Sequence, residues 1–336
     1  MRKIKVFDYT FHVMHQLDMI TALKDDCEFY YCTNSWREWR TKDFTDARPV
    51  PENIHFVPYY EPNKYDVAII HWDAQCINQT LYKGKLYHEF NNQIKDIPKI
   101  VINHTSPVYP EYGLDNGETF EEHQKKTIEI TKKAIGDNIM VVNSHYCATE
   151  KEWGWGVPIV HGMDSEKFKP KTKEPRVFTA LSPYAMDTYY NRQCMEAVAK
   201  NLEEFYGHTL WWAKLNVKTD VSFETYKDYL AKSLIYIDTS IRTPMNRART
   251  EAMLSGCCVV QVEGAHDLDR WAKHNENIIL VPNQPKVIAQ IVTDLIENQY
   301  DKCIEIGKKA RETAIKHFNY KRYRQDWIKL LKETIK

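Results

Sequence analysis

The sequence predicts an α/β protein with two doubly wound parallel sheets, one in each half of the chain. Short runs rich in Val, Ile, Tyr and Phe alternate with helical stretches, which is the pattern of parallel strands joined by helical crossovers. Several of these runs are apolar at nearly every position, as in strands that helices cover on both faces. With 336 residues, the chain is long enough for two domains that each have a core.

Five strands are expected in each half of the chain. They are 3–9, 27–33, 65–72, 99–104 and 139–144, then 176–181, 209–213, 234–239, 257–262 and 277–281. Between the halves Pro and Lys accumulate and no helical period survives over roughly 165–175, which indicates a linker. We therefore expect an N-terminal domain over 1–165, a second domain over 166–318, and a separate final helix over 319–336. In that helix Tyr323, Trp327, Leu330 and Leu331 share one apolar face, typical of core packing.

Composition and charge exclude several classes of protein. Hydrophobic residues make up 43% and charged residues 27%, as in an ordinary globular protein. No segment approaches the roughly 18 apolar residues of a membrane span, and the start of the chain is too polar for a signal peptide. Eight cysteines without zinc-ligand spacing favour a reducing, cytoplasmic compartment and no structural zinc.

The two halves carry opposite charge. Residues 1–165 hold 18 basic against 24 acidic residues, and residues 166–336 hold 28 against 22. The positive charge of the second half favours binding of an anionic ligand such as a nucleotide. The negative charge of the first half argues against nonspecific electrostatic binding of a long polyanion. The alternative is a chance distribution of solvated charge.

The most informative segment is residues 237–262. It reads as a strand, an irregular turn, a helix that starts near Asn246 and stops at Gly256, and a second strand. This order places the start of a helix at the carboxyl end of a parallel strand, where open α/β sheets bind phosphates. Arg247 and Glu251 lie four residues apart on one face, suited to a diphosphate and to ribose hydroxyls respectively. The alternative is a surface ion pair.

This segment resembles the donor-binding motif of the GT-B glycosyltransferases, especially the retaining family 4 group. Ser240, Glu251-Ala252-Met253 and Gly256 match the motif, while Thr243 stands where the family has a first Glu. A second match is His161-Gly162-Met163-Asp164 followed by Phe168 and Pro170, where the family chain leaves its acceptor domain. The glycine-rich first loop of the family is absent, because Asp8-Tyr9-Thr10-Phe11-His12 stands there.

The resemblance implies two Rossmann-like domains that face each other across a cleft, with the final helix crossing back onto the first. It implies transfer of a hexose or pentose from a nucleoside-diphosphate sugar to a hydroxyl, with retention of configuration and without a metal or cofactor. The donor-binding residues it implies are Glu251 for the ribose, Asn246, Arg247, Arg192 and Lys214 for the diphosphate, Thr243 facing the sugar, and Ser240 and Met245 nearby. His104 and Asp73 are expected to face the acceptor, with His71 and His12 lining the acceptor cleft.

Some interpretations stay open at this stage. Asp73 has two interpretations: it activates the acceptor, or it caps a helix. Two interpretations also apply to Trp36 and Trp39, which have basic neighbours. Their rings stack on a sugar or a nucleobase, or they belong to an ordinary surface segment. The sequence leaves four kinds of acceptor open: a polysaccharide, a protein side chain, a metabolite or a hydroxylated DNA base. Two rival functions are a non-catalytic nucleotide-sugar-binding module and a nucleotide-sugar epimerase.

Overall fold

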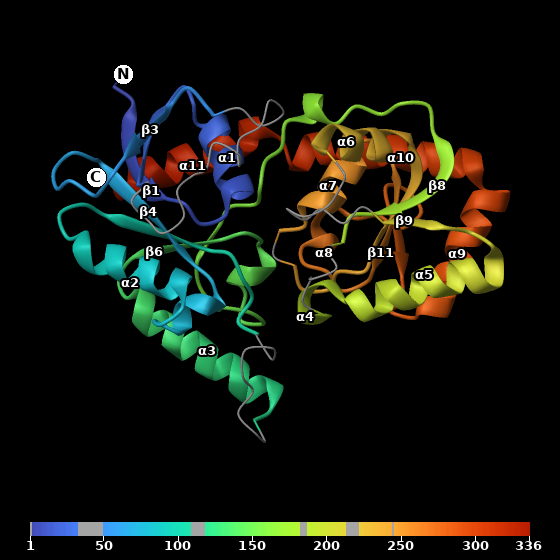
Figure 1. Ribbon diagram of the computed structural model, residues 1–336, viewed down its shortest axis with the longest axis horizontal. Helices are drawn as coiled ribbons and strands as arrows, with labels where there is room; N and C mark the ends of the chain where they lie inside the picture. The colour runs from blue at the N-terminus through green and yellow to red at the C-terminus, as the bar shows by residue number, and fades with distance from the viewer. Residues whose placement is uncertain (1, 33–49, 109–117, 182–186, 213–221, 244) are drawn as a thin grey trace. The chain divides into compact units, whose positions relative to one another are not determined.

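The computed structural model describes residues 2–32, 50–108, 118–181, 187–212, 222–243 and 245–336. The chain forms two compact units, each built around one parallel sheet (Figure 1). Unit 1 comprises residues 1–163 and 320–336, and unit 2 comprises residues 164–319. The final helix α11 thus belongs to unit 1 although it follows unit 2 in the sequence.

Unit 1 contains a seven-stranded parallel sheet with the strand order β3-β2-β1-β4-β5-β6-β7. The strands are β1 (Ile4–Tyr9), β2 (Cys27–Cys32), β3 (Ile54–Val57), β4 (Val67–Trp72), β5 (Lys99–Asn103), β6 (Ile139–Val142) and β7 (Val157–Pro158). The order reverses between β1 and β4, so the topological switch point of the Rossmann type lies between these two strands.

Two edge strands of this sheet, β3 and β7, were not predicted. The middle residues of β3 are exposed, and β7 spans two residues that include Pro158, so neither strand carries the apolar run of a buried strand. The central strand β4 is buried at every position, as its sequence predicts.

Alternate residues of each central strand face two separate cores of unit 1. The helices α1 (Val13–Ala22) and α11 (Tyr320–Thr334) cover one face of the sheet, and α2 (Tyr82–Gln93) and α3 (Phe120–Ile135) cover the other (Figure 1). In β4, for example, Ile69 belongs to the first core and Ile70 to the second. Burial on both faces explains why the strands read as continuous apolar runs.

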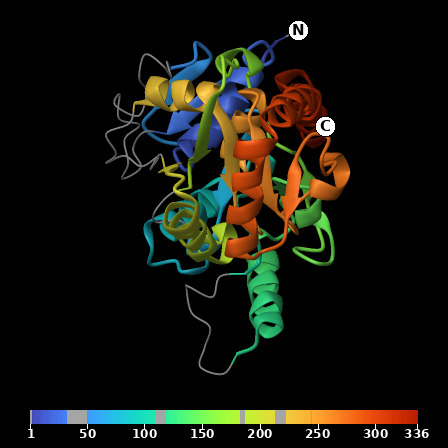
Figure 2. The ribbon, with the colours of Figure 1, turned by 90° about the vertical axis from the view of Figure 1, so that its right-hand side faces the viewer.

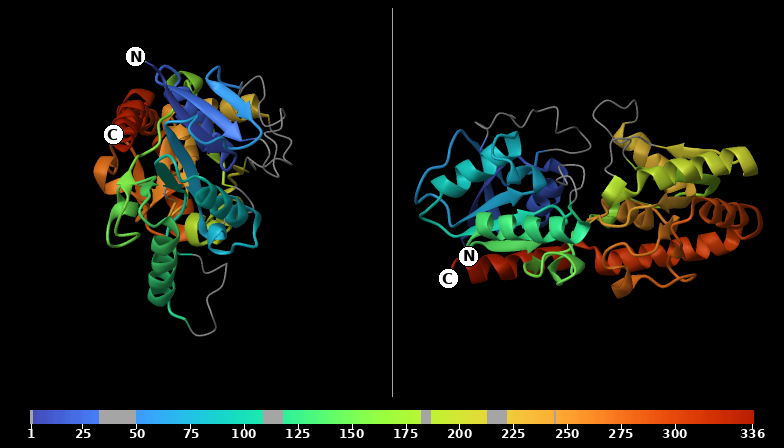
Figure 3. Two further views of the ribbon diagram at one scale, coloured as in Figure 1. Left: turned by 90° about the vertical axis from the view of Figure 1, so that its left-hand side faces the viewer. Right: turned by 90° about the horizontal axis from the view of Figure 1, so that it is seen from below.

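Helix α11 docks on α1 through the apolar face expected from the sequence. In the right-hand view of Figure 3 this final helix, in red beside the C-terminus, lies along unit 1. Tyr323, Trp327, Leu330 and Leu331 are buried, and the Tyr320 hydroxyl donates to Asp18 Oδ1 at 2.9 Å. A Cβ on Gly162 would lie 2.5 Å from Tyr323 Cβ. Glycine at this position therefore lets the helix approach the segment 161–163.

Unit 2 contains a five-stranded parallel sheet with the strand order β12-β11-β10-β8-β9. The strands are β8 (Glu174–Thr179), β9 (Leu210–Trp212), β10 (Ser233–Asp238), β11 (Cys258–Val262) and β12 (Ile279–Val281). The helices are α4 (Asp187–Tyr190), α5 (Arg192–Tyr206), α6 (Phe223–Lys232), α7 (Arg247–Leu254), α8 (Leu268–Trp271), α9 (Pro285–Asn298) and α10 (Tyr300–His317). The strand order reverses between β8 and β10, so the switch point of this sheet lies beside the carboxyl end of β10.

One core of unit 2 lies between the sheet and the helices α5, α9 and α10 (Figure 2). Its strand residues alternate, for example Ile235 and Ile237 of β10. The eight cysteines are free thiols, and all are buried. Among the helices in the described part of the chain, none is both long and apolar enough to cross a bilayer.

Candidate functional site

In unit 1, side chains from three neighbouring strands meet at the carboxyl edge of the sheet. Asp8 lies near the end of β1, His71 near the end of β4, and His104 directly after β5. These strands are adjacent in the sheet and flank its switch point, which is where open α/β sheets bind ligands. The three residues are 33 to 96 positions apart in the sequence, so the strand order brings them together.

The Asp8 carboxylate is the buried centre of a hydrogen-bond network. Its Oδ1 accepts from the Tyr9 backbone N–H at 2.6 Å and from Gln16 Nε2 at 3.0 Å, and it lies 2.8 Å from His71 Nε2. Its Oδ2 accepts from the Tyr31 hydroxyl at 2.8 Å. Four donors surround this carboxylate, so its negative charge is well compensated although the side chain is fully buried.

His104 lies within a stack of rings at the same edge. Its Nε2 is 3.0 Å from His71 Nδ1, and its ring stacks on Phe11 with centroids 5.3 Å apart. The rings of His12 and His15 meet it edge-on, at 4.5 and 5.1 Å. Burial lowers the pKa of His104 well below its usual range, and neighbouring imidazoles and the Lys83 ammonium act in the same direction. His104 is therefore a neutral imidazole at neutral pH.

Asp73 caps the short 3-10 helix η2 (Ala74–Ile77), which is one of the two interpretations left open by the sequence. Its Oδ1 accepts from the Gln75 backbone N–H at 2.9 Å, and its Oδ2 forms an ion pair with Lys83 of α2. His12 Nε2 lies 3.8 Å from the same Oδ2. Asp73 thus lies beside the histidine cluster, with its carboxylate already engaged. Two further acceptor candidates, Trp36 and Trp39, lie outside the described residues.

In unit 2, the carboxyl end of β10 is held by a compact polar turn. Asp238 Oδ1 accepts from the Ser240 backbone N–H at 2.9 Å and from its hydroxyl at 2.5 Å. Asn246 Nδ2 donates to Asp238 Oδ2 and to Ser240 Oγ, while its Oδ1 accepts from the Arg249 backbone N–H at the start of α7. The Asn246 side chain is thus used to shape the turn and to cap the helix, so a contact of Asn246 with a ligand would fall to its backbone.

The first turns of α7 carry the two residues that the sequence singled out. Arg247 Nη2 lies 3.6 Å from Glu251 Oε1, and the side chains are 18% and 7% exposed. Glu251 Oε2 accepts from the Tyr226 hydroxyl of α6 at 2.6 Å. Burial and the Glu251 charge raise the pKa of Tyr226 well above its usual range, so this hydroxyl stays a donor. The pair is therefore largely buried and anchored, unlike a surface ion pair.

The other end of α7 is fixed by two cations. Lys173 Nζ donates to Ser255 O at 2.7 Å and to Ala231 O at 3.0 Å, and Arg311 Nη1 donates to Leu254 O. Positive charge at a helix C-terminus offsets the helix dipole. Gly256 follows with φ +72°, the left-handed terminator expected from the sequence. These contacts hold the helix, and with it the position of Arg247, against the sheet.

The loop after β10 is tied to the segment before α5. Thr239 Oγ1 donates to Tyr190 O at 2.9 Å, and the Ile241 backbone N–H donates to Tyr189 O at 2.9 Å. Buried Thr243 lies 3.5 Å from Tyr189 O through its hydroxyl. These bonds bring the first residue of α5, Arg192, to the same region of unit 2.

The other residues predicted to bind the nucleotide-sugar donor are Arg192, Met245 and Lys214. Arg192 pairs with Glu196 at 3.5 Å and is 35% exposed. Met245 is half-buried between the turn and α7. Lys214 lies outside the described residues.

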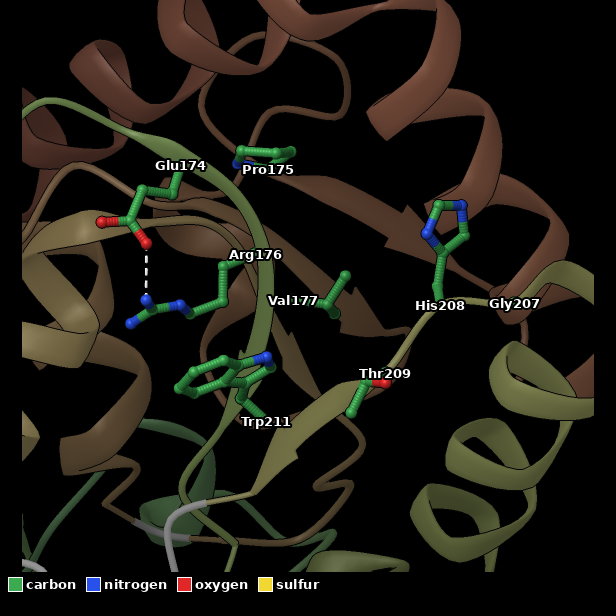
Figure 4. A pocket seen from close by; sticks show the side chains of 8 residues that line it. All are labelled: Glu174, Pro175, Arg176, Val177, Gly207, His208, Thr209 and Trp211. Atoms are coloured by element: carbon green, nitrogen blue, oxygen red, sulfur yellow. Dashed lines mark hydrogen bonds and ion pairs between the residues drawn. The ribbon is translucent and has the colours of Figure 1, made fainter.

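A separate pocket lies at the opposite edge of the unit 2 sheet (Figure 4). Its cavity volume is about 260 Å³, and it is lined by residues at the amino ends of β8 and β9: Glu174, Pro175, Arg176, Val177, Gly207, His208, Thr209 and Trp211. The Arg176 guanidinium stacks 4.1 Å from the Trp211 ring centroid and pairs with Glu174 at 2.5 Å. This pocket lies at the opposite end of the sheet from the start of α7, because the strands are parallel and α7 starts at their carboxyl ends.

Several residues of both sites were missed by sequence reasoning. Asp8 gave a weak signal, as a charged residue inside an apolar strand run. Lys83 and Tyr226 gave none, because their roles depend on helices packing beside Asp73 and Glu251. In the described part of the chain, no group of three or more His, Cys, Asp or Glu residues is arranged to hold a metal ion.

No protein-family model matches the chain, and no curated protein sequence matches it. Solved structures do match it along its whole length. HepE from Anabaena, solved in complex with UDP and glucose, is 14% identical with a TM-score of 0.67, and the match covers 98% of this chain and 99% of that one. Sucrose-phosphate synthase from Thermosynechococcus elongatus is 13% identical with a TM-score of 0.66 over 99% of both chains.

A glycosyltransferase from Rickettsia africae is 12% identical with a TM-score of 0.66 over the full length of both chains. These neighbours are glycosyltransferases of the GT-B fold. The α/β fold with two parallel sheets predicted from the sequence is therefore confirmed, and it is the GT-B fold.

Proposed function

We propose that this protein is a glycosyltransferase that moves a hexose or pentose from a nucleoside-diphosphate sugar to a hydroxyl acceptor. The observation that carries the proposal is the start of α7 at the carboxyl end of β10, beside the switch point of unit 2, with Arg247 and Glu251 anchored on it. The positive end of the helix dipole and a guanidinium there suit a diphosphate. HepE, which shares the fold, has been solved with UDP and with UDP-glucose.

Each unit has a role in this proposal. In unit 2, Arg247, Arg192 and the first N–H groups of α7 bind the diphosphate, Glu251 binds the ribose, and Thr243 faces the sugar. In unit 1, His104 faces the acceptor hydroxyl, with His71 and His12 beside it. Asp73 acts mainly as a cap and as the partner of Lys83.

The finer features of the reaction also belong to the proposal. Positive charge from Arg247 and the helix N-terminus can stabilise the leaving diphosphate, so we propose that no bound metal is needed. Retention of configuration is what the resemblance to family 4 implies, and NMR of the product's anomeric proton measures it. The eight free thiols support a cytoplasmic location.

The proposal is tested by calorimetry with UDP, GDP and ADP and with the matching nucleosides. A bound diphosphate at 100 times its Kd adds about 2.7 kcal/mol to the stability of the fold, so a thermal-shift screen reveals the preferred base. Arg247→Lys should weaken diphosphate binding nearly as much as Arg247→Ala, since lysine lacks the planar fork, while nucleoside binding hardly changes. Arg270→Ala, an exposed arginine of α8, is the matched control.

Turnover separates the rival functions. Release of nucleoside diphosphate from the preferred nucleotide sugar, slow with water and faster with an acceptor, supports a transferase. Conversion of the sugar without release of diphosphate would instead identify an epimerase. Tight binding with no turnover for any acceptor would identify a binding module. No binding of any nucleotide would refute the proposal.

A further inference from the structure

Three side chains of unit 1 form an unbroken hydrogen-bonded line at the carboxyl edge of the sheet. It runs from Asp8 Oδ1 to His71 Nε2 over 2.8 Å, and from His71 Nδ1 to His104 Nε2 over 3.0 Å. Asp8 and His71 are fully buried, whereas His104 is partly exposed. The line thus leads from the fully buried Asp8 carboxylate to the less deeply buried His104.

The buried end of the line determines where the protons lie. A carboxylate oxygen accepts hydrogen bonds, so the proton between Asp8 and His71 lies on His71 Nε2. Gln16 Nε2 is 2.9 Å from the same nitrogen, but its two hydrogens are used on Asp8 Oδ1 and Tyr9 O. The Gln16 amide is fixed in this orientation because its Oε1 accepts two backbone N–H groups.

The remaining assignments follow from the first. A neutral imidazole that carries its one proton on Nε2 has an Nδ1 that only accepts, and for His71 in this form His104 donates from Nε2. Neutral His104 then has no proton on Nδ1. Among the described residues, none forms a hydrogen bond with His104 Nδ1.

The surroundings of His104 keep it in this neutral form. The groups that act on it are His71 from β4, His12 and His15 at α1, and Lys83 from α2. Asp8 lies one imidazole further away, and the Asp73 carboxylate lies beside His12 and Lys83. Burial, the three imidazoles and Lys83 lower the pKa of His104 well below its usual range. Burial, the neighbouring imidazoles and the Lys83 ammonium therefore all disfavour protonation of His104.

We propose that Asp8 and His71 are positioning residues that hold the proton of His104 on Nε2, so that Nδ1 is offered as a hydrogen-bond acceptor to a substrate hydroxyl. A hydroxyl group must donate a hydrogen bond to be oriented in this way, and the opposite tautomer of His104 could not accept it. That the partner is a substrate hydroxyl rests on the proposed function, whereas the tautomer does not.

The tautomer is measured directly by two-bond proton–nitrogen NMR of protein labelled with 15N-histidine, without any substrate. In the wild-type protein His71 and His104 should both carry their proton on Nε2. His71→Phe keeps an aromatic ring but removes both ring nitrogens, including the acceptor for His104, so His104 should become a mixture of tautomers. Tyr31→Phe is the matched control, because it removes a donor from Asp8 Oδ2 and leaves the line from Oδ1 intact. A wild-type His104 with its proton on Nδ1 would overturn the proposal.

Asp8→Asn is the second variant, in case His71→Phe does not fold. Three donors converge on Oδ1, so the amide oxygen should occupy that position and the tautomers should persist. Loss of the negative charge should nevertheless lower the pH at which His104 takes up a proton. An unchanged titration of His104 would show that Asp8 does not act on it through His71, against the proposal.

The functional half of the proposal is tested by release of UDP from UDP-glucose across the pH range. In His71→Phe we expect kcat/KM to fall about tenfold, the size of one hydrogen bond of about 1.4 kcal/mol, with UDP binding unchanged. Equal kcat/KM in His71→Phe and Tyr31→Phe would overturn the proposal even if the tautomers are as expected. If the wild-type protein binds none of UDP, GDP and ADP, the proposed function is refuted instead, and the tautomer assignment stands on its own result.

Discussion

Replacing Tyr226 with phenylalanine removes the hydroxyl that donates to Glu251 Oε2 at 2.6 Å. Tyr226 is 1% exposed and Glu251 is 5% exposed, so water cannot readily take the place of the lost donor. A hydrogen bond to a charged group contributes about 1.5–3 kcal/mol, and we expect the free energy of unfolding to fall by about that amount. Because burial raises the pKa of Tyr226, the hydroxyl remains protonated, and this loss should be the same throughout the neutral pH range.

The same substitution should weaken binding of the nucleotide. Glu251 keeps its contact with Arg247 but loses the donor that fixes its other oxygen. If Glu251 binds the ribose, a less well-placed carboxylate should lower the affinity for UDP by about tenfold, which corresponds to about 1.4 kcal/mol. Affinity for inorganic pyrophosphate, which has no ribose, should hardly change.

The assay is calorimetry with UDP and with pyrophosphate, together with urea unfolding. Tyr229→Phe is the matched control, because it removes a hydroxyl from the same helix where the ring packs against Phe178 and Trp211. Equal stability and equal UDP affinity in the two variants would refute the reasoning. A loss of stability with unchanged UDP affinity would leave Tyr226 a structural residue and would remove Glu251 from the ribose site.

Three further predictions concern the rest of the molecule. Gly162→Ala should lower the free energy of unfolding by about 1–3 kcal/mol, because its Cβ would lie 2.5 Å from Tyr323 Cβ; urea unfolding with an unchanged midpoint would contradict this. Folding lowers the pKa of His104 below its ordinary value, so the unfolded state binds more protons and stability should fall as the pH falls below about 6.5. His104→Gln should flatten that dependence, and equal slopes would count against it. Turnover should persist in excess EDTA, and activity that is lost and then restored by manganese or magnesium would disprove metal independence.

The sequence predicted the strands that are buried on both faces, because a short, continuous run of β-branched and aromatic residues is typical of such strands. It also predicted the order of strand, turn, helix and glycine around α7, since capping and termination signals are local. Arg247 and Glu251 share a face because helix geometry fixes residues four apart, and the structure places them 3.6 Å apart. The edge strands β3 and β7 lack such a pattern and could not be found.

Other parts of the candidate sites depend on which strands are neighbours. Asp8 and His71 are joined because β1 pairs with β4, although β2 and β3 come between them in the sequence. The sequence drew attention to His71 and His104 as strand ends but gave no reason to connect them with each other or with Asp8. Similarly, the sequence allows Asp73 to be an activating group or a cap, and its contacts with Gln75 and Lys83 became visible only in three dimensions.

The sequence by itself determined the fold class and the local chemistry of α7, because hydrophobic periodicity and helix signals act over a few residues. Tertiary structure alone decided which polar groups meet. Pairing of distant strands buries Asp8 among four hydrogen-bond donors. Packing of α6 on α7 places the Tyr226 hydroxyl where it donates to Glu251. A buried charge is stable only where hydrogen-bond donors or opposite charges lie beside it. The fold brings these partners together from distant parts of the chain, so no single position of the sequence predicts them.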